Sequence, residues 1–411
     1  MSKDTITQKV DTSDLKKSMY VSELDRPWIE SPFIFQGFLI TSDQELAQLA
    51  NTCKYVYVDV LKSKVEVPQR MVMTTPIKRN HYEKKETPPV VVSFEKEFAR
   101  AKSIYIDTIE NITQLLFDLR AGKLFAVEDV KNSVIEITGS VMRNPSSMML
   151  LTQIESHSSH AAKHALNVCI LSAAFARYLG MNHEQLYELG IGALLHDVGE
   201  TCLPDGLIDK QENYTPEELH LLHNHTIEGG NLLSKLEGIP PSAITIAMTH
   251  HERANGSGYP RRLSNEQIDL FARIVSIADV YDAVTTGTAR EPAITSTDAL
   301  KSMYDWRDEL FDGELVELFI QSIGIYPIGS TVQLNSGEIG IVITASSERR
   351  LTPTLMLVLG PNNETYQPPL ILNLAQYKDQ ESQKYEITNI VRPEDYGIDK
   401  TSYIMRDLYA S

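Results

Sequence analysis

The histidines constrain what this chain can fold into more than any other feature. The chain has 411 residues and eleven histidines, and ten of these lie between His157 and His251. A single histidine is most often a surface or core residue with one satisfied hydrogen bond. A cluster is different, because imidazole and carboxylate groups together are the usual ligands of zinc, iron and manganese. The sequence therefore favours a fold in which these histidines surround a metal.

Two of the candidate stretches lie in or beside helical patterns. The stretch LLHDVGE at residues 194–200 places His196 and Asp197 side by side. His160 and His164 are four residues apart in a helical pattern, so their side chains share one helix face. Both stretches are candidates for presenting ligands from a short piece of chain.

Further candidates follow along the chain. His250 and His251 are adjacent and precede a glycine-rich turn, and Asp279 lies in the apolar helical pattern ARIVSIADVYDAV. A buried carboxylate without a partner is costly, so a metal or another cation is a natural partner for Asp279, with an ordinary salt bridge as the alternative. Other metal motifs are absent, because His251-Glu252 is not followed by the second histidine of H-E-x-x-H and no C-x-x-C pair exists.

The apolar pattern divides the chain into segments. KYVYVDV alternates like a half-buried strand, and prolines among charged residues then mark an exposed linker. From Phe94 to about residue 324 apolar residues recur at helical spacing, and short strand-like runs follow. We predict a small N-terminal α+β regulatory domain at 1–61, a linker at 62–92, connecting helices at 93–142, a helical domain at 143–325 and a β appendage at 326–411.

Composition restricts the compartment and the partners. The net charge of −17 argues against a nucleic-acid polymer or an anionic membrane as partner, although a small anionic substrate needs only a local positive site. Three dispersed cysteines suggest a reducing compartment. The polar N-terminus lacks the apolar core of a signal peptide, and the most apolar stretch, 165–181, is too short to span a bilayer. We therefore expect a cytoplasmic protein without a membrane partner.

The ordered histidines and aspartates resemble the HD-GYP domain of bacterial cyclic dinucleotide phosphodiesterases. The most specific element is HHERANGSGYP at residues 250–260, and the resemblance covers roughly residues 145–325. The stretch 19–40 is similar to a small domain often fused to HD-GYP modules. The resemblance implies a mainly α fold: an HD-type all-helical metal-dependent phosphohydrolase domain, with a small α/β N-terminal domain and a short C-terminal β appendage.

The resemblance also implies the chemistry. Two divalent metals, iron or manganese with zinc as the alternative, would share Asp197 as a bridging carboxylate. Such a pair lowers the pKa of a bridging water and clamps the phosphoryl oxygens, so the implied reaction is hydrolysis of cyclic di-GMP to linear pGpG, with further cleavage to GMP as an extension. His164, His196 and Asp279 would complete one metal site, and His225, His250 and His251 the other.

Substrate contacts are implied for the turn and for three arginines. Gly258 would let the backbone approach a phosphate, and Tyr259 offers a hydroxyl and a flat face. Arg253, Arg273 and Arg290 are the candidate cations.

Three positions depart from the family pattern. Glu200 stands where the family has a lysine, and Thr288 and Glu291 stand at an arginine and a lysine position. We therefore expect weak affinity for cyclic di-GMP or preference for another dinucleotide such as 3′,3′-cyclic GMP-AMP. The alternative is a non-hydrolytic module that keeps the metal cage and binds a nucleotide or a signalling protein. Aromatic residues of the N-terminal segment are expected to pack on the helical domain or on a second copy in a homodimer.

Overall fold

The chain forms two compact units, Met1–Glu83 and Lys84–Ser411. The computed structural model describes residues 7–24, 38–60, 62–65, 82, 85–154, 159–208, 210–287, 291–345, 351–376 and 385–405. The boundary between the units falls inside the predicted linker 62–92, much of which lies outside the described residues.

The first unit contains a four-stranded antiparallel sheet in the order β1-β4-β2-β3. Val56 and Val58 of β4 are fully buried, whereas Tyr55 and Tyr57 are only partly buried. The alternation predicted for residues 54–60 is therefore confirmed for Tyr55–Val58, whereas Asp59 is also buried. The elements are β1 (Thr7–Asp11), the turn η1 (Thr12–Asp14), β2 (Tyr20–Leu24), β3 (Phe38–Leu39), α1 (Asp43–Thr52) and β4 (Tyr55–Asp59).

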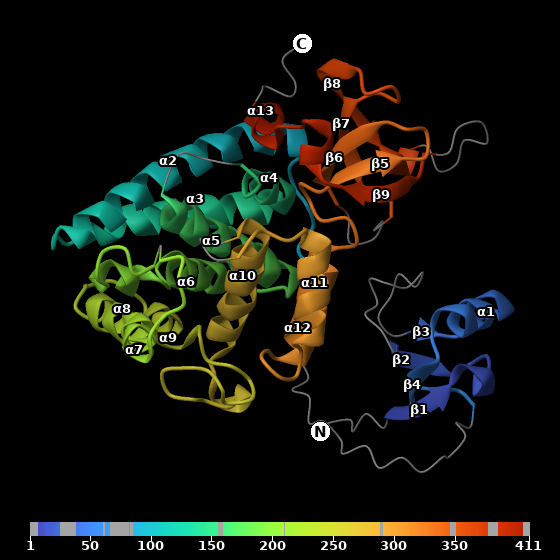
Figure 1. The fold of residues 1–411 in the computed structure, drawn as a ribbon, viewed down its shortest axis with the longest axis horizontal. Coiled ribbons are helices and arrows are strands. Elements are labelled where there is room, and N and C mark those ends of the chain that lie inside the picture. Colours follow the sequence, from blue (N-terminus) through green and yellow to red (C-terminus); the bar gives the residue numbers. More distant parts are fainter. Residues whose placement is uncertain are drawn as a thin grey trace. The chain divides into compact units, whose positions relative to one another are not determined.

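Helices dominate the second unit (Figure 1). Several begin at the side chains that favour helix starts: Ser159 caps α5, and Asn182 and Gln185 form a capping box at α6. The helices are α2 (Phe94–Arg120), α3 (Val127–Arg143), α4 (Pro145–Leu151), α5 (His160–Tyr178), α6 (His183–Leu194), α7 (Pro216–His223), α8 (His225–Leu233), α9 (Pro241–Thr249), α10 (Leu270–Thr286), α11 (Ser296–Asp305) and α12 (Gly313–Ile323), with the turns η3 (Val198–Cys202) and η4 (Asn265–Gln267).

Helix α5 is the centre of this bundle. Residues 165–173 are all buried, because α5 packs against α2, α3, α6 and α10. This explains why its sequence is apolar on almost every face. Helices α2 and α3 also pack on α4 and α5, so the segment expected to connect the domains belongs to the helical unit.

The C-terminal strands form a five-stranded antiparallel sheet in the order β8-β7-β6-β5-β9. Its core includes Val332, Val342, Leu355 and Leu372, and β6 contacts α4. The mainly helical fold with small N- and C-terminal sheets is thus confirmed. Among the described helices, none has the length and apolar character needed to cross a membrane. The elements are β5 (Thr331–Leu334), β6 (Ile339–Thr344), β7 (Thr354–Leu359), β8 (Thr365–Asn373), η5 (Leu374–Gln376), β9 (Ile387–Val391), η6 (Pro393–Tyr396) and α13 (Lys400–Met405).

Candidate metal centre

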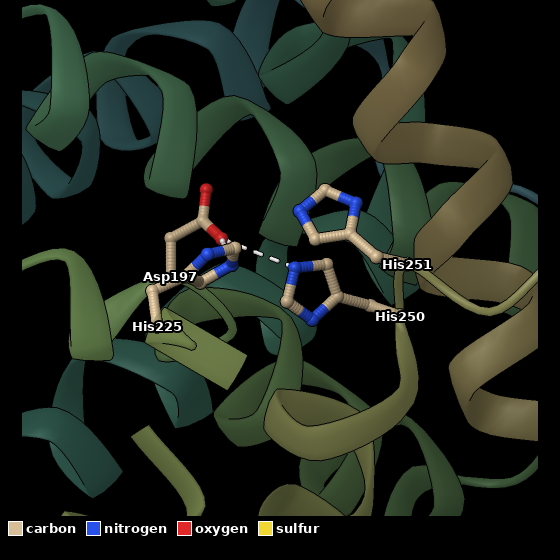
Figure 2. A group of neighbouring side chains, drawn as sticks. All are labelled: Asp197, His225, His250 and His251. Atoms are coloured by element: carbon tan, nitrogen blue, oxygen red, sulfur yellow. Dashed lines mark ion pairs between the residues drawn. The ribbon is translucent and has the colours of Figure 1, made fainter. Parts of the chain in front are cut away.

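The candidate ligands come from separate helices and converge on one place. Helix α5 supplies one, the turn between α6 and η3 two, the start of α8 one, the end of α9 two, and α10 one. Their ligand-type atoms form two groups, each within 4.8 Å, which share one aspartate. Figure 2 shows the group made by Asp197, His225, His250 and His251. The other group is His164, His196 and Asp197, with Asp279 beside it.

Asp197 joins the two groups through its two oxygen atoms. Its Oδ2 lies 3.2 Å from Nε2 of His196 and 3.9 Å from Nε2 of His164. Its Oδ1 lies 3.1 Å from Nε2 of His250 and 3.4 Å from Nε2 of His225. One carboxylate therefore faces two different sets of imidazole nitrogens, which is the arrangement expected of a bridging ligand.

Asp279 adds a second carboxylate to the group that contains His164. Its Oδ1 lies 3.1 Å from Nε2 of His164 and 3.9 Å from Nε2 of His196. The side chain is buried in α10, as the apolar pattern around it predicts.

Backbone carbonyls fix the rings of three of these histidines. Nδ1 of His196 lies 2.8 Å from the carbonyl oxygen of Ala193. Nδ1 of His225 lies 2.5 Å from that of Leu222, and Nδ1 of His250 lies 3.1 Å from that of Ile246. Each acceptor lies three or four residues earlier in the chain. Donation from Nδ1 to these carbonyls directs Nε2 at the cluster, where it can bind a metal once it carries no proton.

A carboxylate, instead of a backbone carbonyl, fixes the ring of His164. Nδ1 of His164 lies 2.7 Å from Oδ2 of Asp282, and the amide of Asn167 donates to Oδ1 of Asp282 at 2.9 Å. Asp282 is not among the candidates predicted from the sequence. The available signal was its position three residues after Asp279, which places both carboxylates on one face of α10.

The donor atoms fit a metal better than they fit one another. Nε2 of His196, His225 and His250 and Oδ1 of Asp197 are buried and have no hydrogen-bond partner within the described part of the chain. These histidine nitrogens lie within ion-pair distance of the carboxylate of Asp197, but the angles are not those of a hydrogen bond. An unsatisfied buried polar atom costs about 1–3 kcal/mol, and a cation bound between these atoms would satisfy them together. Nitrogen and carboxylate donors suit iron, manganese or zinc.

The electrostatics of the cluster also favour a cation. Burial raises the pKa of Asp197, but the neighbouring histidines, His196 first, outweigh it and hold this pKa well below its usual range. Burial also raises the pKa of Asp279, but His164 outweighs burial, so this pKa is lowered as well. Burial lowers the pKa of His251 well below its usual range, so its ring is neutral. Ionised carboxylates and a neutral imidazole are the states that bind a metal.

The chain is similar to known proteins over most of its length. Residues 148–315 match the HD domain family, and residues 7–130 match a family described as a domain of unknown function. A cyclic di-GMP phosphodiesterase of Pseudomonas aeruginosa is 27% identical over 371 residues, which are 90% of this chain and 89% of that protein. The chain belongs to the HD-GYP family.

Two relatives match over shorter stretches. A cyclic di-GMP phosphodiesterase of Thermotoga maritima is 33% identical over 160 residues, covering 39% of this chain and 44% of that protein. The 3′3′-cGAMP-specific phosphodiesterase 2 of Vibrio cholerae is 28% identical over 173 residues, covering 42% of this chain and 33% of that protein. Relatives of this HD-GYP protein therefore carry names with two different cyclic dinucleotides.

Glu200, which replaces the lysine of the HD-GYP pattern, is half-buried in η3. Burial and then the charge of Asp197 raise the pKa of Glu200 to about 7. The carboxyl group is therefore close enough to the cluster to interact with it, and it is not an ordinary solvated acid. The preceding Gly199 packs tightly: a Cβ there would lie 1.9 Å from the carbonyl oxygen of His225 and 2.5 Å from the amide nitrogen of Gly229.

The HD-GYP turn is held by a residue that the sequence analysis did not single out. The carboxylate of Glu252 is buried and accepts hydrogen bonds from the amides of Arg261 at 2.7 Å and Leu263 at 2.9 Å. Gly258 is enclosed by backbone, because a Cβ there would lie 2.3 Å from the nitrogen of Arg253. One face of Tyr259, expected to be open to a nucleotide, is stacked on His223.

The predicted arginine contacts are engaged within the protein or lie outside the described residues. Nη1 of Arg253 donates to the hydroxyl of Ser276 at 2.5 Å. Nη1 of Arg273 donates to Oδ2 of Asp312 at 2.9 Å, and the side chain of Arg273 is 14% exposed. Arg253 thus ties the HD-GYP turn to α10, and Arg273 ties α10 to the start of α12. Arg290 and Thr288 lie outside the described residues, Glu291 is exposed, and His160 contacts the carbonyl of Gly287 instead of the cluster.

Proposed function

We propose that this chain hydrolyses cyclic di-GMP to linear pGpG with two divalent metals, in bacterial second-messenger signalling. The main support is the placement of Asp197. Its two carboxylate oxygens face two separate sets of imidazole nitrogens, 3.1–3.4 Å away at the nearest. A single metal site would not need a carboxylate in this position, whereas a pair of metals is commonly bridged by one.

The proposed roles follow from the donors. Two divalent ions, iron or manganese with zinc as the alternative, would activate water and neutralise charge on the phosphoryl oxygens. Asp197 would hold both ions and is therefore the central catalytic residue. His164, His196 and Asp279 would complete one site, and His225, His250 and His251 the other. The enclosed backbone at Gly258 would keep the HD-GYP turn, with Tyr259, beside the cluster.

Another cyclic dinucleotide, such as 3′,3′-cyclic GMP-AMP, is the second candidate substrate. Two observations favour it. Glu200 places a carboxyl group with a pKa of about 7 where HD-GYP proteins have a lysine, and Arg253 and Arg273 bind other side chains of the protein. A charge-assisted phosphate contact contributes about 1.5–3 kcal/mol, so losing such contacts weakens the binding of cyclic di-GMP.

Product analysis of the metal-loaded full chain tests the proposal. The protein would be incubated with cyclic di-GMP, 3′,3′-cyclic GMP-AMP and linear pGpG, with Asp197→Ala as the inactive control. We expect a linear dinucleotide from at least one cyclic substrate. A protein that contains two metals but hydrolyses none of them would instead be a non-hydrolytic module for nucleotide or protein binding.

We also propose that the N-terminal unit regulates the helical domain or mediates dimerisation and contributes no metal ligand. Because α2 and α3 belong to the helical unit, a truncation that tests this should begin near residue 84 and keep both helices. The truncated protein should keep two metals while its regulation or oligomeric state changes. A folded fragment without metals would contradict this division.

A further inference from the structure

His251 differs from the other candidate histidine ligands in how its ring is held. Nδ1 of His164, His196, His225 and His250 each has a hydrogen-bonding oxygen. Among the described residues, no hydrogen-bond acceptor is found for the ring of His251. A metal-binding imidazole without such a partner needs another restraint on its orientation.

Other rings supply that restraint. The centroid of His251 lies 4.1 Å from that of His250, 5.1 Å from that of His225 and 4.8 Å from that of Tyr259. His225 and His250 are fixed by backbone carbonyls, as described above. Tyr259 is the one of these three neighbours that is not itself a candidate ligand. Its main chain is also tied to His251, since its amide donates to the carbonyl of His251 at 3.3 Å.

Tyr259 is in turn held by His223. The two rings are stacked, with centroids 3.8 Å apart and planes 16° from parallel. His223 is the last residue of α7, which begins with a capping box between Thr215 and Glu218. Lys210 pairs with Glu218 at 2.7 Å, so the helix has a fixed start. His223 is in neither group of ligand atoms.

We propose that His223 is a positioning residue that orients His251 through Tyr259. Stacking on His223 fixes the plane of the tyrosine ring, and the tyrosine ring limits the rotation of His251. The imidazole can then present a nitrogen to the metal held by His225, His250 and Asp197. This inference rests on the proposed metal site and concerns how one ligand of it is oriented.

Titration of Mn²⁺ into the metal-free full chain by calorimetry tests the proposal. His223→Ala should weaken one of the two Mn²⁺ sites by roughly tenfold, the lower range for losing a group that orients a ligand. His223→Phe keeps a flat ring without nitrogen atoms and should bind Mn²⁺ like the wild type. His220→Ala is the matched control, because His220 is exposed one turn earlier on the same helix. Circular dichroism would verify that each variant is folded.

A double-variant cycle shows whether His223 acts through the tyrosine. Tyr259→Ala should weaken the same site, and adding His223→Ala to it should cause no further loss. Additive losses would overturn the proposal, as would Mn²⁺ binding by His223→Ala that matches His220→Ala. Equal weakness of His223→Phe and His223→Ala would show that a ring nitrogen matters, and would also overturn it. A wild-type protein that binds none of Mn²⁺, Fe²⁺ and Zn²⁺ would refute the proposed function and this inference together, whereas the results above leave the proposed function unchanged.

Discussion

Gly199→Ala would test whether the close approach of η3 to α8 builds the metal site. A Cβ on Gly199 would lie 1.9 Å from the carbonyl oxygen of His225, whereas real Cβ contacts are at least 3.0 Å. The two segments must therefore separate by about 1.1 Å (3.0 − 1.9). Gly199 follows Asp197 by two residues, so this shift displaces one candidate ligand from another. Oδ1 of Asp197 now lies 3.4 Å from Nε2 of His225. A misplacement of about 1 Å costs roughly 100-fold in rate.

The assay is kcat/KM for the best cyclic dinucleotide, together with the metal content of the purified variant. Gly139→Ala in α3 is the matched control, because its Cβ would meet only the flexible end of Arg143, at 3.2 Å. We expect near wild-type activity from the control and roughly 100-fold loss from Gly199→Ala. A folded Gly199→Ala protein with two metals and the wild-type rate would refute the reasoning, because the backbone contact would then not determine the ligand geometry.

Further predictions concern the cluster itself. Asp197→Ala should lose both metals and all hydrolysis while its circular dichroism stays helical; two metals retained at full occupancy would contradict the bridging role. Asp282→Asn should weaken metal binding by roughly 10- to 100-fold, measured by calorimetry, because His164 loses a carboxylate partner. Glu200→Lys should lower the Kd of a catalytically inert cyclic di-GMP analogue by roughly tenfold or more, and Glu200→Gln by less, since only lysine adds a cation; equal affinity of all three proteins would count against the charge argument. Burial lowers the pKa of His225, but Asp197 outweighs it and raises this pKa to about 9 in the metal-free protein. Metal affinity should therefore rise by about tenfold per pH unit between pH 7 and 9 as that proton is lost, and a flat profile would show that His225 is not a ligand.

The candidate ligands can be predicted from the sequence better than the contacts that surround them. Most candidate ligands stand in short stretches whose residue types suit a metal, but the set that shares one site, with His225 in it, is implied only by the resemblance to HD-GYP domains. Asp282 was accessible by the same reasoning, from its helical spacing after Asp279. The arginines were not, because Arg253 and Arg273 find partners 23 and 39 residues away in sequence. Pairings of that kind depend on tertiary packing, which the local pattern does not encode.

The same limit applies to backbone proximity. Gly199 occupies a family position, but its contact with the backbone of α8 depends on how two segments cross. The alternation in residues 54–60, by contrast, is a local property and predicted β4 correctly. Local periodicity thus determines the elements, and the packing between elements determines which polar side chains remain for a ligand.

The spread of the candidate ligands along the chain links occupancy of the site to the stability of the fold. His164 and Asp279 are 115 residues apart in sequence yet adjacent in space. A cation held there would bind only the folded chain, and at a hundred times its Kd it would stabilise that fold by about 2.7 kcal/mol. Zinc binds such donors more tightly than manganese or iron. A protein loaded with the wrong ion would therefore melt at a high temperature but hydrolyse its substrate slowly. Thermal stability would show that the site is filled, and the rate of hydrolysis would show which ion fills it.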